Sequence, residues 1–202
     1  MTFWQDGQSF KPKRAYRFQM LIQGAGDERT VDVGRAGIGK VGIAPFVIKK
    51  VDKPGFAISE SGHNYLNHTF YYPGKITWDE ITVDIVDVIG RDEEGVDASA
   101  EVVKMLKVAG YRIPSDQNQL QTISKSDSIR GLGQVKIVQI DEIGNTVETW
   151  TLKNAWIKTV KFGTLDYTSE DLLNVGITLR YDFCEFDSVN SKDSKMTVGQ
   201  GV

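Results

Sequence analysis

A short glycine-rich stretch matches part of a nucleotide-binding motif. Residues 34–40 fit the Gly-x-x-x-x-Gly-Lys portion of a phosphate-binding loop, whose backbone N–H groups and lysine hold phosphates. The next residue is Val41, so the hydroxyl that ligates magnesium in such loops is missing. Gly42 and Pro45 also block the helix that has to follow a phosphate-binding loop. The stretch therefore predicts a flexible glycine loop and no nucleotide site.

The chain has few side chains suited to metal binding or redox chemistry. His63 and His68 lie five residues apart in a region that we interpret as loop and strand, where this spacing puts them on opposite faces. Cys184 is the only cysteine, so it has no internal disulfide partner, and a zinc site built from Cys and His ligands is disfavoured. We expect no metal, no cofactor and a reducing compartment.

Carboxylates and tryptophans are present, but their arrangement suggests no catalytic or ligand site. Asp79, Asp84 and Asp182 lie on predicted strands, yet nothing in the sequence pairs two of them as the acid and base of a glycosidase. Three of the four tryptophans also lie on predicted strands, where core or interface packing is commoner than stacking on a ligand. The tryptophans are Trp4, Trp78, Trp150 and Trp156. We therefore expect a protein that is not an enzyme.

Composition limits the function classes further. The 202 residues carry 24 Lys and Arg against 27 Asp and Glu, a formal charge of −3 at pH 7, so tight binding to a phosphate backbone is not indicated. A hydrophobic content of 40% is enough for a buried core. The first residues lack the basic and apolar segments of a signal peptide, and no run of about 18 apolar residues occurs. We expect a product made in the cytoplasm, without membrane insertion.

Alternation of apolar and polar residues predicts a mainly β scaffold. The clearest strand spans residues 173–183, and a second spans residues 16–22. A third strand, over residues 76–88, changes its apolar phase at Asp79 and Glu80, which predicts a β-bulge there.

Turn residues divide the remaining β-forming segments. Residues 135–140 and 146–152 are separated by a short connection that contains glycine, which predicts a β-hairpin. Glycine or proline also closes three weaker strand predictions, at residues 46–51, 65–72 and 155–162.

One amphipathic helix is predicted over residues 98–109, because its apolar residues fall on one face. Asp97 is suited to cap the N-terminus of this helix, and Gly110 and Pro114 are suited to end it. The acidic residues 92–94 precede the positive end of the helix dipole.

The predicted elements define the expected fold class. Many strands and one helix indicate a mainly β domain, with the helix packed over one end or face of a sheet. The polar, aperiodic residues 115–128 predict a surface loop. We expect a single domain over residues 1–187 and a flexible C-terminal tail over residues 188–202.

Four passages occur in order around the helix. Residues 71–83 read Tyr-Tyr-Pro-Gly-Lys-Ile-Thr-Trp-Asp-Glu-Ile-Thr-Val, and residues 152–158 read Leu-Lys-Asn-Ala-Trp-Ile-Lys. Residues 163–171 read Gly-Thr-Leu-Asp-Tyr-Thr-Ser-Glu-Asp, and the alternating strand 175–183 follows. In element order this arrangement resembles the phage tail tube protein family, which forms the inner tube of contractile, T-even-like tails.

The resemblance implies a structural role and a set of partners. It implies a β-sandwich or half-barrel with one packed α-helix. Subunits of that family close into hexameric rings as a continuous barrel, and the rings stack into a tube for genome delivery. The implied partners are further copies of the chain, sheath protein, baseplate and tail-terminator proteins, and double-stranded DNA that passes through the lumen without specific binding. The implied location is the virion tail, with host cytoplasm during assembly.

Two alternatives stay open at the level of the sequence. One is a related component of the same kind of machine, a tube initiator, a baseplate component or the tube of an injection system. The other is a carbohydrate-binding β-sandwich module that uses exposed aromatic residues such as Tyr65, Tyr71 and Tyr72.

Two sets of residues are candidates for the functional surfaces. The polar sides of the strands at 76–88 and 173–183 are expected to line the channel. These channel-lining candidates are Thr82, Asp84, Asn174, Thr178, Arg180 and Asp182. The segment 52–64, rich in glycine and polar residues, is expected to be an extended loop that becomes ordered against a neighbouring ring. Its ring-contact candidates are Pro54, Gly55, Ser59, Ser61 and Gly62.

Overall fold

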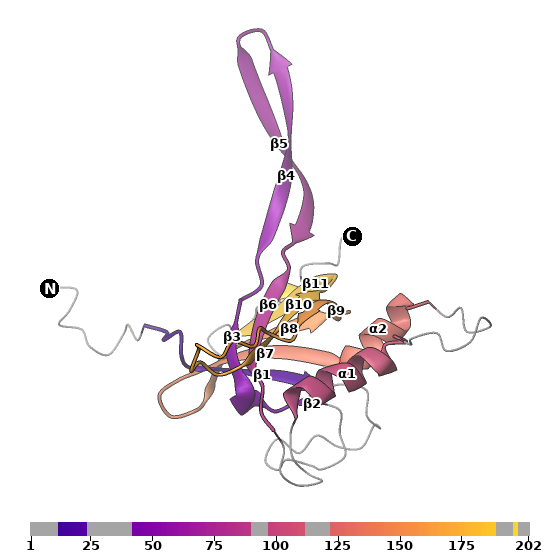
Figure 1. Ribbon diagram of the computed structural model, residues 1–202. Coiled ribbons are helices and arrows are strands. Elements are labelled where there is room, and N and C mark those ends of the chain that lie inside the picture. Colours follow the sequence, from indigo (N-terminus) through magenta and orange to yellow (C-terminus); the bar gives the residue numbers. More distant parts are fainter. Residues whose placement is uncertain (1–11, 24–41, 90–96, 112–121, 189–195, 198–202) are drawn as a thin grey trace, which may run out of the picture.

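Two packed sheets, two helices and one long hairpin make up the computed structural model, which describes residues 12–23, 42–89, 97–111, 122–188 and 196–197 (Figure 1). The large sheet has the order β12-β11-β8-β7-β1-β2. Its strands are β1 (Phe18–Gln23), β2 (Gly42–Ile43), β7 (Gln134–Ile140), β8 (Thr146–Lys153), β11 (Phe183–Ser188) and β12 (Met196–Thr197). The small sheet has the order β3-β6-β10-β9. Its strands are β3 (Ile48–Val51), β6 (Ile81–Val86), β9 (Trp156–Lys161) and β10 (Asn174–Arg180).

The inner faces of the two sheets share one hydrophobic core. In the small sheet the alternating residues Ile81, Val83 and Ile85 of β6 are completely buried, as the period-two pattern requires. They meet apolar residues of the large sheet, such as Met20 and Ile137, in the same cluster. Burying each such side chain contributes about 1.5–3 kcal/mol. The prediction of a mainly β sandwich is confirmed.

The C-terminal strand prediction is wrong in its last part, because the chain changes sheets at a corner. β10 ends at Arg180 in the small sheet, and β11 begins at Phe183 in the large sheet. At the corner Asp182 donates its N–H to the carbonyl of Lys153 at 3.0 Å. Tyr181 and Cys184 are both buried, so the inward-facing phase shifts by one residue there. The alternation in the sequence continues through Phe183 and hides this corner.

A similar correction applies near Asp79 and Glu80. The predicted bulge is instead the break between two strands of different sheets, since β5 (His68–Trp78) ends before it and β6 begins after it. Backbone hydrogen bonds still join the flanking segments, from the Asp79 N–H to the Gly55 carbonyl at 2.9 Å and from the Asp52 N–H to the Thr82 carbonyl at 3.1 Å.

The expected loop over residues 52–64 is wrong for most of its length. β4 (Phe56–Tyr65) pairs with β5 along a long hairpin that projects from the sheets (Figure 1). The turn lies at Leu66 and Asn67, so the strand predicted at 65–72 starts later and passes through the expected stop at Pro73. The small and polar residues of β4 have low strand propensity. Pairing with β5, which is rich in aromatic and β-branched residues, outweighs this low propensity.

Two helices lie side by side at one end of the sheets (Figure 1). α1 (Ala98–Val108) confirms the predicted helix, and the Asp97 carboxylate accepts a hydrogen bond from the Ala100 N–H at 2.9 Å. α2 (Lys125–Leu132) lies where the polar composition predicted loop up to residue 128. Ser124 caps it, because its hydroxyl accepts a hydrogen bond from the Asp127 N–H at 3.1 Å.

Other predictions keep their elements with shifted ends. The β7–β8 hairpin and β9 are confirmed, and the predicted strand at 46–51 begins with the 3-10 turn η1 (Pro45–Val47). Residues 34–41, the acids at 92–94, Pro114 and Trp4 lie outside the described residues. Neither helix in the described part of the chain has the length and apolar character needed to cross a bilayer.

The contact between the helices generates a stability prediction. A Cβ added to Gly131 of α2 would lie 2.8 Å from the backbone N of Ala109 and from the carbonyl oxygen of Met105. Because backbone atoms cannot move aside cheaply, we expect Gly131→Ala to lower the free energy of unfolding by about 1–3 kcal/mol. Ser126→Ala, on the exposed side of the same helix, is the control and should change it by less than about 0.5 kcal/mol. Urea unfolding of both variants measures the difference, and equal stabilities would contradict the close packing.

Candidate assembly surfaces

The outer face of the small sheet is polar and contains most of the channel-lining candidates. Residues paired across antiparallel strands share a face, and Thr82 of β6 is paired with Thr178 of β10. Asp84 lies two residues from Thr82 and is therefore on the same face, as are Asn174 and Arg180 of β10. Five of the six candidates thus lie on one surface. Their position in a channel stays a prediction.

Asp182, the sixth candidate, lies apart from this face, at the corner between β10 and β11. Its carboxylate accepts hydrogen bonds from the Lys125 ammonium at 2.7 and 2.8 Å and from the Asn154 amide at 2.8 Å. The hydrogen bonds from Lys125 are the main reason that the pKa of Asp182 is lowered. Arg180 instead lies 3.7 Å from the Glu80 carboxylate. Asp182 is therefore paired with Lys125 and does not offset the charge of Arg180.

The small sheet has open edges within the described residues. β3 and β9 are its outermost strands, and each is paired on one side only. Exposed lysines occur on both edges, Lys49 and Lys50 on β3 and Lys161 on β9. Charged edges of this kind oppose uncontrolled pairing with other chains, while the unpaired backbone groups allow a specific pairing.

The hairpin exposes apolar side chains that its own subunit does not cover. Every residue of β4, and every residue of β5 before Trp78, is exposed. The large apolar side chains among them and in the turn are Phe56, Ile58, Tyr65, Leu66, Phe70, Tyr71, Tyr72 and Ile76. Apolar surface on a projecting element marks an interaction site. Three ring-contact candidates, Ser59, Ser61 and Gly62, lie on β4, and Pro54 and Gly55 lie half-buried at its base.

The pairing of the hairpin corrects the prediction for the two histidines. His63 is paired with Phe70, and His68 is paired with Tyr65, so both histidines are on the same face of the hairpin. The two were expected on opposite faces because the turn between them was not predicted. No group of three or more potential metal ligands occurs in the described residues.

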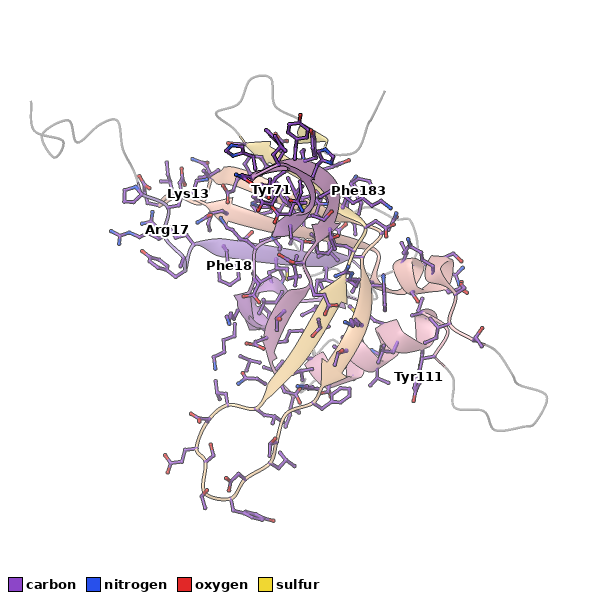
Figure 2. All side chains as sticks on the ribbon, turned by 90° about the horizontal axis from the view of Figure 1, so that it is seen from above. Lys13, Arg17, Phe18, Tyr71, Tyr111 and Phe183 are labelled. Carbon is purple, nitrogen blue, oxygen red and sulfur yellow. The ribbon has the colours of Figure 1, made fainter. Side chains whose placement is uncertain are left out.

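The tyrosines proposed for sugar stacking do not form one platform. Tyr72 is paired with Ser61 and shares its face with Tyr65, whereas Tyr71 is paired with Gly62 and lies on the other face. Figure 2, which looks down on the hairpin, shows Tyr71 on this projection. Two of the tryptophans pack as expected, since the rings of Trp150 and Phe186 lie 4.5 Å apart and those of Trp78 and Tyr181 lie 5.9 Å apart.

A buried charge network holds the base of the hairpin against the large sheet. Glu148 of β8 is almost completely buried and pairs with the ammonium groups of Lys13 and Lys53. Lys53 precedes the hairpin and also donates to the side chain of Gln139 on β7. The Gln139 amide in turn donates to the carbonyl of Arg14 at 3.1 Å. Lys13 lies at the edge of the body in Figure 2. The network therefore connects the N-terminal segment, the large sheet and the hairpin.

Neither a protein-family model nor a curated protein matches the sequence. A chain of the anti-feeding prophage baseplate matches 90% of this chain and 99% of its own length at 16% identity, with a TM-score of 0.60. A chain of the sheath-tube complex of PVC, an extracellular contractile injection system, matches 94% and 99% at 19% identity, with a TM-score of 0.56. A chain of the tube-terminating cap of the anti-feeding prophage matches 92% and 97% at 16% identity, with a TM-score of 0.58.

The chain has the tube-protein fold of contractile injection systems. At these identities the likeness concerns the fold. The three matching chains belong to a baseplate, a sheath-tube complex and a cap. These are structural assemblies. The tube fold therefore confirms the resemblance seen in the four sequence passages at the level of architecture.

The charge network at Glu148 predicts a pH-dependent stability. Burial acts to raise the pKa of Glu148, but hydrogen bonds from Lys13 and Lys53 outweigh it and lower the pKa from 4.5 to about 2. A lowered pKa in the folded state stabilises the protein above pH 4.5, and this contribution is lost as the pH falls towards about 2. We expect Glu148→Gln to lower the free energy of unfolding by about 3 kcal/mol at pH 7.

Urea unfolding at several pH values tests this prediction. The difference between the wild type and Glu148→Gln should shrink as the pH falls from 4.5 towards 2. Glu185→Gln is the matched control, because Glu185 forms a more exposed pair with Lys153 at 2.9 Å, and its loss should cost less than about 1 kcal/mol. A difference that is constant with pH would rule out the charge of Glu148 as its cause.

Proposed function

We propose that this chain is the structural subunit of the inner tube of a contractile injection machine, with six subunits in each ring and rings stacked into a channel. The observation that carries this proposal is the small sheet, which has a polar outer face and two open edges within a tube fold. Within the described residues this face has no cover and the two edge strands lack an outer partner. Joining copies of the sheet into a closed barrel around an aqueous channel would keep the face in water and pair the edges.

Ring closure is proposed to pair β9 of one copy with β3 of the next. Each of these strands uses one side for its neighbour in the small sheet, and the other side is unpaired in the described residues. Pairing between copies would make the sheet continuous and bury the edge backbone groups. The alternating apolar residues would keep their present place in the core beneath, so the subunit would not need to refold.

The channel wall is then the polar face that carries Thr82, Asp84, Asn174, Thr178 and Arg180. The pairing also puts Lys50, opposite Asp84, and Lys161, opposite Gly176, on this face. Asp52 lies 3.9 Å from Lys50, and Glu80 lies 3.7 Å from Arg180, so carboxylates offset the added cations. A nearly balanced wall suits the passage of duplex DNA or of other charged cargo without tight binding.

The partners follow from the same proposal. Matching chains occur in a sheath-tube complex, a baseplate and a sheath/tube terminator, so sheath, baseplate and terminator proteins are the proposed partners of this tube. A phage tail that delivers a genome is the proposed setting. Micrographs and a sizing column test the proposal directly, because purified protein should form rings or tubes, and a stable monomer at all concentrations would contradict it.

The hairpin is proposed to make the contacts between rings, which predicts the effect of shortening it. Removing residues 60–64 together with 69–73 deletes five facing pairs and keeps the turn. The deleted side chains are exposed and belong to a separate sheet, so the thermal midpoint of the subunit should change by less than about 2 °C. Tube growth should fall by at least about tenfold in negative-stain micrographs. Normal tubes from the shortened protein would show that ring stacking does not use the hairpin.

The proposed channel wall predicts a gain of DNA binding when its charge is reversed. Asp84→Lys adds two positive charges per subunit, about twelve per six-membered ring, at one height of the channel. Assembled variant tubes should retain short duplex DNA at low salt and release it as salt is raised, because phosphate contacts depend on counterion release. Ile143→Lys, on an exposed turn away from this face, is the control. Equal retention by both variants would contradict the channel assignment.

A further inference from the structure

An apolar cavity opens between the helices and the base of the hairpin. Its volume is about 790 Å³. Its lining includes Trp78 of β5, Leu106 of α1, Leu132 of α2, and Trp156 and Ile157 of β9. A cavity of this size and composition falls in the range of sites that bind an apolar group.

One polar group in the wall of this cavity has no partner within the described residues. Tyr181 is only 3% exposed, and its hydroxyl oxygen is buried without a hydrogen bond. Burial raises the pKa of Tyr181, so the hydroxyl remains a neutral donor. A buried hydroxyl without an acceptor is unfavourable, so Tyr181 leaves one unpaired donor beside the cavity within the described residues.

The rim of the cavity carries an excess of positive charge. Lys125, Lys158 and Arg180 line it, together with one carboxylate, Asp182. Glu80 pairs with Lys158 and lies near Arg180, so three cations stand against two carboxylates. An occupant with apolar side chains and several carboxylates would match both the lining and the rim.

A loop with this composition connects β9 and β10 at the ends of these strands that lie away from the cavity. Residues 162–173 connect β9 and β10 and extend away from the rest of the molecule (Figure 2). Within this loop Leu165 is 87% exposed and Tyr167 is fully exposed, so neither side chain has cover in its own subunit. The loop contains Asp166, Glu170 and Asp171 and neither lysine nor arginine.

The loop is held in shape by its own hydrogen bonds. The Asp166 carboxylate accepts hydrogen bonds from the N–H of Thr168 at 2.9 Å and from its hydroxyl at 2.8 Å. The Ser169 hydroxyl accepts another from the Asp171 N–H at 3.2 Å. A loop that is ordered before binding loses less conformational entropy on binding.

We propose that the 162–173 loop of one copy inserts into the cavity of a neighbouring copy, with Leu165 and Tyr167 against the apolar lining and the acidic residues at the cationic rim. This inference rests on the proposed tube function, because it supplies a specific contact between subunits. The cavity and the loop lie at opposite ends of β9 and β10, about 20 Å apart for strands of this length, so the loop is out of reach of its own cavity. The contact is therefore head-to-tail and repeats from copy to copy.

The hairpin tip is the competing occupant, and charge argues against it. Within β4, the turn and β5 the only Asp, Glu, Lys and Arg residues are Glu60 and Lys75, which cancel. The tip therefore matches the lining through Tyr65 and Leu66 but offers no excess of carboxylates to the rim. The 162–173 loop matches both the apolar lining and the cationic rim of the cavity.

A double variant of the loop tests the proposal. Leu165→Ser with Tyr167→Ser should leave the thermal midpoint of the subunit unchanged, because both side chains are exposed. It should raise the concentration needed for assembly by at least about tenfold. Ile143→Ser, which removes an equally exposed apolar side chain from the β7–β8 turn, is the matched control and should assemble normally. Normal assembly of the double variant would overturn the proposal and leave the tube function standing.

Cross-linking identifies the occupant. Cys184 is buried, so a cysteine introduced at Tyr167 or at Ser128 in the cavity wall is the only accessible thiol in each variant among the described residues. Mixing Tyr167→Cys with Ser128→Cys under oxidation should give a covalent dimer, and neither variant alone should. A dimer between Ser128→Cys and Leu66→Cys, with none from Tyr167→Cys, would overturn the proposal in favour of the hairpin tip. If the wild-type protein does not assemble at all, the proposed tube function itself is contradicted. This outcome is seen before any variant is made.

Discussion

The structure depends on the mutual burial of the two inner sheet faces. The apolar residues of β6 and β10 share one core cluster with residues of the large sheet, α1 and α2, and that packing fixes which side of the small sheet faces outwards. The outward side is left polar, and its edge strands are left without neighbours in the described residues. The surfaces that matter for assembly are thus consequences of how the core is filled, and no separate binding domain is required.

Much of the fold follows from local patterns in the sequence. Alternation correctly indicates β1, β6 and β10, and cap and stop residues correctly indicate α1, because these signals report the environment of each side chain directly. The missed features depend on contacts between distant residues. α2 has a polar sequence, and its start is marked only by the local bond between Ser124 and Asp127. The corner at Tyr181 and Asp182 is defined by the Lys153 carbonyl on another strand.

The functional surfaces divide in the same way. Five channel-lining candidates share a face because period-two alternation fixes the side of a strand on which each residue lies. Asp182 is misplaced because the chain leaves the small sheet before it and enters the large sheet after it. The Glu148 network and the cavity were not predicted at all, since both bring together segments that are distant in the sequence. Glu148 stands between Val147 and Thr149, and this local sequence gives no sign that its side chain is buried with two lysines.

The order of strands in the large sheet also sets a sequence of events for each newly made chain. β1 pairs mainly with β7, so most of its partners, such as Val135 opposite Ile22, are made more than 100 residues later. β6 gains its second neighbour in the small sheet only when β10 has been made, about 90 residues later in the chain. Such distant pairings make folding slow compared with local helix formation. Among the described strands, the edge strand β9 and its neighbour β10 are made after β1 to β8, so pairing between copies at this edge can follow the folding of the earlier strands.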